Sequence, residues 1–462
     1  MTDARSTEST ESTESTESTA PPVHVVIVGA GLAGCLLACY LARRGMRVSL
    51  FERRSDPRAV GAERGRSINL AISARGLDAL ERIDLAEQVM AAALPMRGRQ
   101  IHDERGETAY APYSADGRRA INSISRSGLN NTLLEAALAS PLVSVAFNHR
   151  LVRVAAGTAA AEFATPGGAA HVEADIVIGA DGAFSAVRGR LQSAPGVSYR
   201  QDYLDCQYKE LTIPARDGQF ALAPDALHIW PRGRSMMIAL PNPDKSFTCT
   251  LFWPPTGPDS FEEVSDGQEA MAYFRRRYPD AAPLMPTLAA DFDANPVASL
   301  VTIRCSSWVV DGKVALIGDA AHAIVPFFGQ GANAAFEDVV ELDRCLTEHH
   351  QDWPAALGEY QRRRIANTDA IADMALENFV EMSERSASRV FRFTRRLQHG
   401  LQRRLPQHYV SRYELVSFST IPYAEVVGRT TFAAQVRSVA AGLRHVGAAA
   451  LRATVHRKGE HT

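Results

Sequence analysis

Three glycines near the start of the sequence have the spacing G-x-G-x-x-G, which is typical of a dinucleotide-binding site. Gly29 permits a tight turn, and Gly31 lets backbone N–H groups approach a pyrophosphate. Gly34 allows a helix to pack closely on a strand. Glu52 ends the next apolar segment, where a carboxylate accepts hydrogen bonds from both ribose hydroxyls and repels a 2′-phosphate. The pattern therefore predicts a dinucleotide whose ribose next to Glu52 carries no 2′-phosphate.

The segments around this fingerprint have the pattern of a βαβ unit. Residues 23–28 and 47–52 are predicted to be strands buried on both faces, and residues 35–45 are predicted to form the helix between them. Such a unit opens a doubly wound parallel sheet. Residues 208–254 contain short strand-like runs between turn clusters, which is typical of an antiparallel sheet, and helix formers dominate from about residue 329 onward. We therefore expect an α/β fold with a doubly wound Rossmann-type domain, an antiparallel-sheet domain and a C-terminal helical region.

Two later turns favour FAD over NAD as the dinucleotide. Asp181 and Gly182 follow a third apolar strand-like segment, and Gly318 and Asp319 follow a fourth. The carboxylate of Asp319 is in place to accept a hydrogen bond from a ribityl hydroxyl. Gly331 begins a predicted helix, whose N–H groups can face the edge of the flavin that gains negative charge on reduction.

The composition of the 462 residues excludes several classes of protein. Lys and Arg number 50 against 52 Asp and Glu, so the chain has no cationic field for nucleic acid. The six cysteines are scattered without a CxxC pair, which predicts neither a metal site nor disulfides and favours a cytoplasmic location. The sequence shows no apolar run of transmembrane length and no signal-peptide pattern. Residues 1–22, rich in Glu, Ser and Thr, are predicted to be a disordered tail.

The fingerprint, the Asp-Gly turn and the Gly-Asp turn, in this order, resemble the class A flavoprotein monooxygenases of the para-hydroxybenzoate hydroxylase fold. Further segments resemble the kynurenine 3-monooxygenase family: GRSINLAIS (65–73), MRGR (96–99), SISRSGLN (123–130), YKEL (208–211), LHIWPRG (227–233), PFFGQGANAAFED (326–338) and MALENFVEM (374–382). The resemblance implies FAD as cofactor and NADPH and O2 as co-substrates. It also implies that L-kynurenine is hydroxylated to 3-hydroxykynurenine through a flavin C4a-hydroperoxide.

The resemblance further implies which residues hold the substrate. The positions that match the family's anchor for the amino-acid end are Arg99, Tyr113, Asn378 and Tyr423. A guanidinium can bind a carboxylate through two parallel hydrogen bonds, and a tyrosine hydroxyl can add another. The positions that match the lining of the aromatic end are Ile238, Leu240, Thr250, Phe252, Phe327, Phe328 and Met382.

The predicted FAD contacts combine the fingerprint with positions matched to the family. They are Gly29, Gly31, Leu32, Gly34, Glu52, Arg53, Arg54, Ala71, Arg126, Leu151, Asp181, Asp319, Gly331, Ala332 and Asn333. His322 lies among alanines without a metal-spaced partner and is predicted to be structural. Since we find no second glycine fingerprint, NADPH is expected to dock transiently in a groove over the flavin.

The predicted domain bounds follow from these segments. The FAD-binding domain comprises residues 23–75, 121–198 and 304–350, the substrate-binding sheet domain 76–120 and 199–303, and the helical region 351–462. Within the last region, residues 432–455 are expected to form an amphipathic helix on the protein's own surface. Two alternatives stay open: a hydroxylase of another aryl amino acid or phenol, and a flavin-binding interaction module without turnover. A homodimer also stays open.

Overall fold

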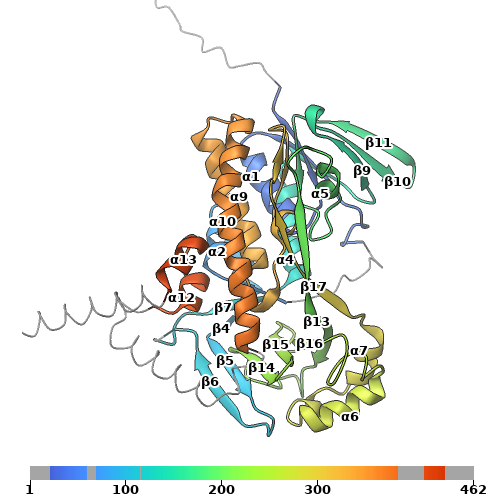
Figure 1. Cartoon of the computed structure of the whole chain (residues 1–462), viewed down its shortest axis with the longest axis vertical. Helices are drawn as coiled ribbons and strands as arrows, with labels where there is room; N and C mark the ends of the chain where they lie inside the picture. Colours follow the sequence, from blue (N-terminus) through green and yellow to red (C-terminus); the bar gives the residue numbers. More distant parts are fainter. Residues whose placement is uncertain (1–20, 60–68, 115, 383–409, 432–462) are drawn as a thin grey trace, which may run out of the picture.

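The computed structural model describes residues 21–59, 69–114, 116–382 and 410–431. Figure 1 shows two sheet regions, one above the other, with long helices along one side. The predicted tail at 1–22, apart from its last two residues, and the predicted amphipathic helix at 432–455 lie outside the described residues.

The upper region is built on a six-stranded sheet in the order β18-β19-β12-β1-β2-β8. Its strands are β1 (His24–Val28), β2 (Arg47–Phe51), β8 (Val143–Ala146), β12 (Ile176–Gly179), β18 (Val309–Val310) and β19 (Val314–Leu316). All neighbours are parallel except β18 and β19. The chain passes from β1 to β2 on one side, whereas β12 pairs with the other side of β1. This reversal of strand order makes the carboxyl end of β1 the switch point at which doubly wound sheets bind their ligands.

Helices cover one side of this sheet, and a small sheet with a short helix covers the other (Figure 1). The helices are α1 (Leu32–Arg43), α4 (Arg126–Leu138), α9 (Gly331–Glu348) and α10 (Trp353–Val380). The opposite side carries α5 (Ala186–Leu191) and the strands β9 (Arg150–Ala155), β10 (Ala160–Thr165) and β11 (Gly168–Glu173). Every residue of β1 is buried, as expected for a strand covered on both faces.

The lower region is a seven-stranded sheet in the order β17-β13-β16-β15-β14-β5-β6. Its strands are β5 (Gly98–His102), β6 (Thr108–Pro112), β13 (Tyr199–Ile213), β14 (Ala226–Arg232), β15 (Ser235–Pro241), β16 (Phe247–Trp253) and β17 (Ala298–Cys305). The antiparallel sheet expected at 208–254 is its centre, while the parallel pair β14–β5 was not predicted. Helices α6 (Gly267–Arg277) and α7 (Leu288–Ala294) pack on its outer face around Trp230 and Trp253.

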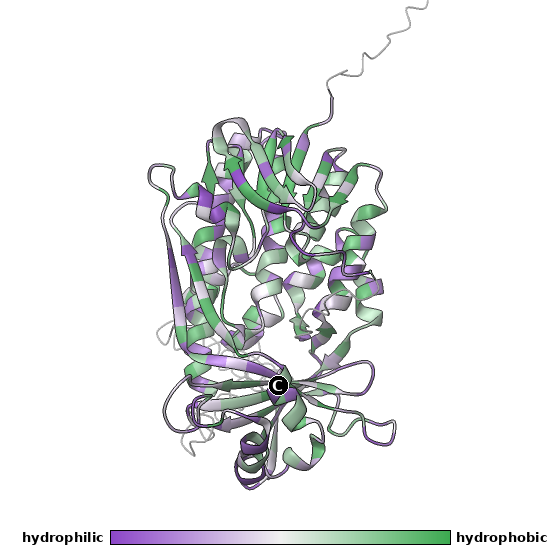
Figure 2. Cartoon of the chain, turned by 90° about the vertical axis from the view of Figure 1, so that its right-hand side faces the viewer, coloured by the Kyte–Doolittle hydropathy of each residue, from purple (hydrophilic) through white to green (hydrophobic). Residues whose placement is uncertain are grey.

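The remaining strands and helices of the described residues form a third set. It consists of the sheet β3 (Asn69–Ile72), β7 (Ile121–Ser125) and β4 (Leu94–Met96), and the helices α2 (Ala74–Glu81), α3 (Ala86–Ala91), α8 (Asp319–His322), α12 (Arg412–Ser417) and α13 (Tyr423–Arg429). Three 3-10 turns complete the described elements, η1 (Ala156–Thr158), η2 (Ala282–Leu284) and η3 (Pro326–Phe328). In Figure 2 the hydrophobic colour follows the strands of both regions. Within the described ranges, none of the helices combines the length and apolar character that a membrane crossing requires.

Candidate active site

The glycine turn joins the end of β1 to the start of α1. Its three glycines differ in what a side chain at each position would meet. Gly29 has φ +107°, and a Cβ there would lie 2.5 Å from the carbonyl oxygen of Ala180. A Cβ on Gly34 would lie 2.0 Å from the carbonyl oxygen of Gly29. A Cβ on Gly31 would meet no atom of the described residues within 4 Å. Gly29 and Gly34 therefore make the turn itself, while Gly31 leaves space where a ligand can approach the backbone.

Glu52 lies against this turn, just after β2. The residue is 7% exposed, and its Oε2 accepts a hydrogen bond of 3.1 Å from the backbone N–H of Ala30. Its Oε1 accepts hydrogen bonds of 3.0 Å from both the backbone N–H and Nε of Arg54. The carboxylate is thus fixed beside the open space at Gly31, in the position expected of a ribose acceptor.

The start of α9 is the second segment that the sequence assigned to the cofactor. Asn333 accepts a hydrogen bond from the N–H of Ser73 and donates to the carbonyls of Ala71 and Gly329, at 2.8 to 2.9 Å. Its amide therefore fixes the turn before the helix. None of the described residues has an atom within 4 Å of a Cβ placed on Gly331, which stands at the positive end of this 18-residue helix. Ala332 follows in the same turn.

The remaining predicted cofactor residues have defined places. Asp181 caps α5, because its carboxylate accepts from the Ser185 hydroxyl and from the N–H groups of Ala186 and Val187. Burial raises its pKa above the usual range of an aspartate. Asp319 begins α8 directly after Gly318, whose N–H is bound by the buried carboxylate of Asp338. The other predicted contacts lie as follows: Leu32 begins α1, Arg53 is exposed after β2, Ala71 lies in β3, Arg126 begins α4 and Leu151 is buried in β9.

These residues fit FAD on structural grounds. Two glycine-bordered openings, at Gly31 and Gly331, present backbone N–H groups at helix N-termini, which is the arrangement that binds a pyrophosphate or a flavin edge that gains negative charge. Glu52, bound to the N–H of Ala30, and Asp319, at the start of α8, supply carboxylate acceptors that suit ribose and ribityl hydroxyls.

The predicted anchor residues Arg99 and Tyr113 meet in the lower sheet, where Arg99 lies in β5 and Tyr113 directly follows the edge strand β6. The guanidinium carbon of Arg99 is 5.6 Å from the ring centroid of Tyr113. A second aromatic side chain completes the group: the Tyr413 ring, from α12, stacks on Tyr113 with centroids 4.8 Å apart. The Arg99 guanidinium carbon is 4.6 Å from the centroid of the Tyr413 ring.

Two buried polar atoms in this group have no hydrogen-bond partner among the described residues, Nε of Arg99 and the hydroxyl of Tyr113. An unpaired buried donor is costly, by about 1 to 3 kcal/mol for a neutral group and more for a charged one. Burial also raises the pKa of the Tyr113 hydroxyl well above its usual value, so the hydroxyl keeps its proton and can donate. A ligand carboxylate between them would satisfy both groups.

The structure does not bring the predicted anchor Tyr423 into this group. The Tyr423 hydroxyl donates to Oε1 of Gln330 at 2.9 Å, and its ring packs under Arg75, with 3.8 Å between centroid and guanidinium carbon. The side chain is fully buried. Tyr413 occupies the place beside Arg99 that was expected of Tyr423. The spacing of Ser411 and Glu414 marks a helix start and could have drawn attention to Tyr413, since Ser411 accepts from the N–H of Glu414.

The apolar residues predicted to line the aromatic end converge from three elements. Ile238 of β15 pairs in register with Thr250 of β16, and Leu240 packs with Tyr113. Phe252 lies 5.0 Å from Phe327 between ring centroids. Phe328 stacks on Tyr413 at 5.6 Å.

Asn378 and Met382 close this wall from α10 and the turn after it. Asn378 Nδ2 donates to the carbonyl of Phe327 at 2.5 Å and contacts the Met382 sulfur at 3.3 Å. Both residues are less than 10% exposed, at 6% and 7%. The amide therefore holds η3 in place beside the apolar wall.

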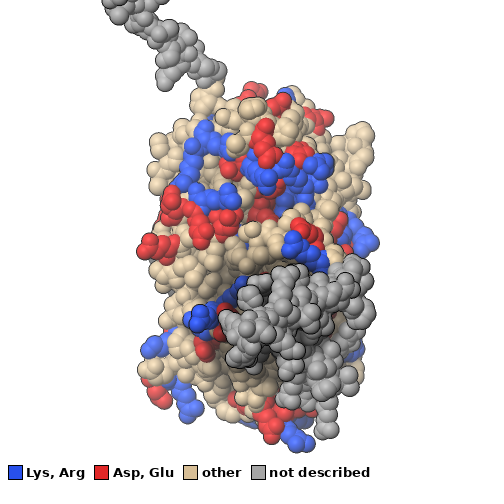
Figure 3. All heavy atoms as spheres, turned by 90° about the vertical axis from the view of Figure 1, so that its left-hand side faces the viewer, with Lys and Arg blue, Asp and Glu red and all other residues tan. Residues whose placement is uncertain are grey.

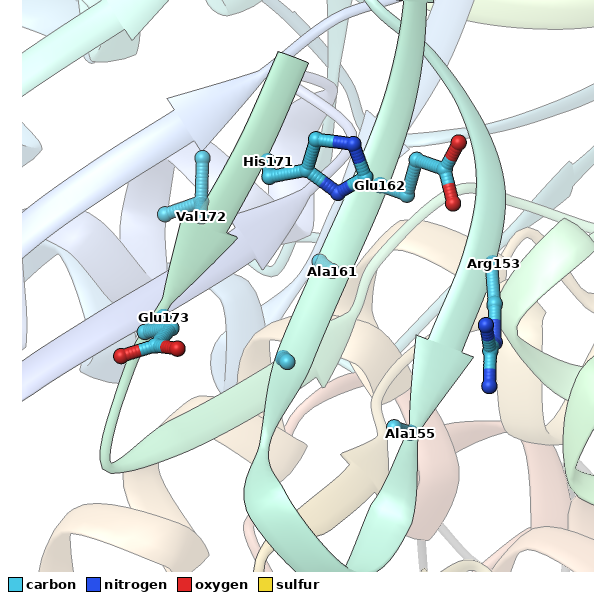
Figure 4. A pocket seen from close by; sticks show the side chains of 8 residues that line it. Arg153, Ala155, Ala161, Glu162, His171, Val172 and Glu173 are labelled. Carbon is cyan, nitrogen blue, oxygen red and sulfur yellow. The ribbon is translucent and has the colours of Figure 1, made fainter. Parts of the chain in front are cut away.

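The surface charge on one face and one hollow of the described residues can be compared with this site. Figure 3 shows basic and acidic side chains interspersed on the face that it displays, without a field of one sign. A hollow on the small sheet is lined by a cross-strand row of Arg153, Glu162 and His171 (Figure 4). This hollow lies on β9 to β11, apart from the glycine turns, and none of its residues is a predicted site residue.

Comparison with known proteins assigns the class. A family model described as FAD binding domain matches residues 22–375. The solved 2-methyl-3-hydroxypyridine-5-carboxylic acid oxygenase superposes with TM-score 0.65 at 22% identity, covering 77% of this chain and 90% of that one. The p-nitrophenol 4-monooxygenase of Pseudomonas putida gives TM-score 0.65 at 20% identity, covering 82% and 94%. These likenesses show the fold, and the family match defines the chain as an FAD-binding protein.

Curated relatives narrow the class. A kynurenine 3-monooxygenase of Myxococcus xanthus is 46% identical over 86% of this chain and 86% of its own length. Those of Salinispora tropica and Dictyostelium discoideum are 43% and 42% identical, covering 94% and 87% of this chain and 98% and 89% of theirs. The chain belongs to the kynurenine 3-monooxygenase family.

Proposed function

We propose that this enzyme hydroxylates L-kynurenine to 3-hydroxykynurenine with NADPH and O2. The observation that carries the proposal is the group of Arg99, Tyr113 and Tyr413, in which two buried polar atoms have no hydrogen-bond partner within the described part of the chain, next to an apolar, aromatic wall. Kynurenine has a matching shape, with an amino-acid end and an aryl amine end. The family membership supports the same substrate.

In this proposal the guanidinium of Arg99 binds the substrate carboxylate, and the hydroxyls of Tyr113 and Tyr413 donate to it. Tyr413 takes the role that the sequence suggested for Tyr423. Asn378 acts by holding η3 through the carbonyl of Phe327, and the ring end lies against Ile238, Leu240, Thr250, Phe252, Phe327, Phe328 and Met382.

FAD, when bound, supplies the redox chemistry, because it accepts hydride from NADPH and activates O2. The chain holds it through the backbone at Gly31 and Gly331 and through Glu52 and Asp319. The aryl amine of the substrate already activates the ring carbon beside it, so the residues here need only orient the ring and exclude water. The predicted FAD contacts Leu32, Arg53, Arg54, Ala71, Arg126, Leu151, Asp181, Ala332 and Asn333 belong to this proposal.

Anaerobic stopped-flow reduction by NADPH, with and without L-kynurenine, tests the proposal. We expect kynurenine to accelerate flavin reduction and, in air, 3-hydroxykynurenine to appear. The first alternative, a hydroxylase of another aryl amino acid or phenol, is tested with a panel of such compounds. A compound that is a better substrate than kynurenine would favour that alternative. FAD-replete protein without kynurenine-stimulated NADPH consumption would favour the interaction module.

The organisation and location of the protein belong to the same proposal. We propose the domain bounds given by the sequence, with NADPH docking in a groove over the flavin, because Glu52 repels a 2′-phosphate in the dinucleotide site. A cytoplasmic location is supported by six free cysteines, all buried. That the protein forms a homodimer is a hypothesis, which the molar mass of the purified protein, measured by light scattering, tests.

A further inference from the structure

Helices α12 and α13 depend on side-chain contacts for their place. Residues 410–431 stand between 383–409 and 432–462, which lie outside the described part of the chain. Arg412 pairs with Glu377 at the surface, where the two side chains are 35% and 66% exposed. Asn367 accepts from the N–H of Ala424 at 3.1 Å. Arg75, whose side chain is 0% exposed, makes a further contact from the interior.

Arg75 binds the backbone of both helical segments with one guanidinium. One terminal nitrogen donates to the carbonyl of Val416, in the last turn of α12, and the other to the carbonyl of Ile421, just before α13. Carbonyls at the end of a helix have no partner within the helix, so a bound guanidinium satisfies a group that would otherwise be costly to bury. The planar fork reaches both carbonyls at once, which a single ammonium does not.

The charge of Arg75 is balanced inside the molecule. Its Nε donates to Glu337 at 2.9 Å, and the other oxygen of Glu337 accepts from Arg364. Arg364 Nε binds Asp338 at 2.7 Å, and Asp338 accepts from the N–H of Gly318. This chain of alternating charges fixes the orientation of Arg75 relative to α9 and to the turn before α8.

The segment held by Arg75 carries Tyr413. Tyr413 and Val416 both lie in α12, and the Tyr413 ring stacks on Tyr113 and lies against the Arg99 guanidinium. Arg75 itself packs on Tyr423 and makes none of its described contacts with Arg99 or Tyr113. Its effect on the anchor group must therefore pass through α12.

We propose that Arg75 is a positioning residue, which holds α12 so that Tyr413 completes the substrate anchor with Arg99 and Tyr113. The statement about substrate rests on the proposed function, whereas the statement about α12 does not. The inference explains why an arginine, with three separate acceptors, is buried on α2.

The test is Arg75→Lys in the full-length, FAD-loaded protein, with Arg82→Lys as matched control. Arg82 caps the same helix but is 52% exposed and pairs only with Asp78 among its described ionic contacts. We expect Arg75→Lys to raise the KM for kynurenine at least tenfold, to leave kcat within threefold, and to accelerate hydrogen exchange of the α12 amides. Arg82→Lys should change none of these. A KM within twofold of the parent, or unchanged exchange in α12, would overturn the inference.

A double-mutant cycle separates positioning from general stability. If Arg75 acts through Tyr413, then Arg75→Lys should add less than twofold to the KM of Tyr413→Ala, because the side chain to be positioned is already gone. If the rise in KM of the double variant equals the product of the rises in the two single variants, the inference is contradicted.

A second variant guards against loss of folding. Glu337→Gln keeps Arg75 but weakens its orientation, and we expect a smaller rise in KM, about three- to tenfold, with the same faster exchange in α12. No change in either quantity would count against the inference. If the parent protein shows no response to kynurenine, the proposed function fails, and hydrogen exchange of α12 in the two variants still decides the role of Arg75.

Discussion

The rings of Tyr113 and Tyr413 stack on each other, with 4.8 Å between centroids and 17° between planes, although 300 residues separate them in the chain. Both rings lie against Arg99, which comes from β5, next to the edge strand β6 of the lower sheet. Three elements of different origin, β5, the segment after β6 and α12, thus place one cation and two phenols together. The group therefore leads to predictions for substitutions of its individual side chains.

Arg99→Lys should weaken kynurenine binding more than tenfold, which corresponds to about 1.4 kcal/mol or more. Lysine keeps the charge but loses the fork that binds both carboxylate oxygens. FAD content should not change. Titration of kynurenine, followed by the flavin absorbance, measures the effect. Arg97→Lys is the control, because Arg97 is exposed and its described side-chain bond is to the carbonyl of Arg118. Affinity within twofold of the parent would mean that Arg99 is not the anchor.

Tyr413→Phe and Tyr423→Phe should change different properties of the protein: the first should weaken kynurenine binding, and the second should lower stability. Removing the Tyr413 hydroxyl should weaken kynurenine binding about three- to tenfold, because one hydrogen bond of roughly 1 kcal/mol is lost. Removing the Tyr423 hydroxyl leaves Oε1 of Gln330 without that donor, so the free energy of unfolding should fall by about 1 to 3 kcal/mol. Kynurenine titration and denaturant unfolding of both variants check this. A binding loss confined to Tyr423→Phe would restore Tyr423 as the anchor.

The glycine turn offers a matched pair of variants. Gly34→Ala should prevent formation of the turn, because its Cβ would lie 2.0 Å from the Gly29 carbonyl oxygen. Gly31→Ala places its Cβ in open space, so stability without cofactor should change by no more than about 1 kcal/mol. FAD affinity should nevertheless fall, since the methyl group enters the space assigned to the pyrophosphate. The ratio of flavin to protein absorbance, together with thermal unfolding of cofactor-free protein, measures both. Full flavin content in Gly31→Ala would place the pyrophosphate elsewhere.

These examples also indicate what the sequence could predict. The βαβ unit was predictable because its strands, helix and glycine turn are local in the chain, and the structure has β1, α1 and β2 there. Arg99 was predicted from the segment MRGR and Tyr113 as a matching position soon after it, and the structure places the two side chains next to each other. Tyr413 was not, because only the packing of α12 against β5 brings it to Arg99, and IPYAEV offered a competing tyrosine. The parallel pair β14–β5 escaped prediction for a similar reason, since its two strands lie more than a hundred residues apart.

The last prediction concerns the pH dependence of stability and rests on His228 in β14. Burial lowers the pKa of His228 from 6.5 to about 4. Its Nε2 donates to the carbonyl of Ala223 at 2.9 Å, so its Nδ1 is the unprotonated nitrogen that accepts from His102 Nε2 at 2.8 Å. Protonation of His228 would break this arrangement.

Because the folded pKa lies below the unfolded one, this contribution to stability is fully present above pH 6.5 and is lost as the pH falls toward 4. The total is about 3 kcal/mol. His228→Gln should therefore flatten the fall in unfolding free energy between these pH values, whatever its effect at pH 7. His171→Gln, on exposed β11, should keep the parent slope. Denaturant unfolding at a series of pH values measures the slopes, and equal slopes in parent and His228→Gln would show that the His228 ring is charged in the folded protein.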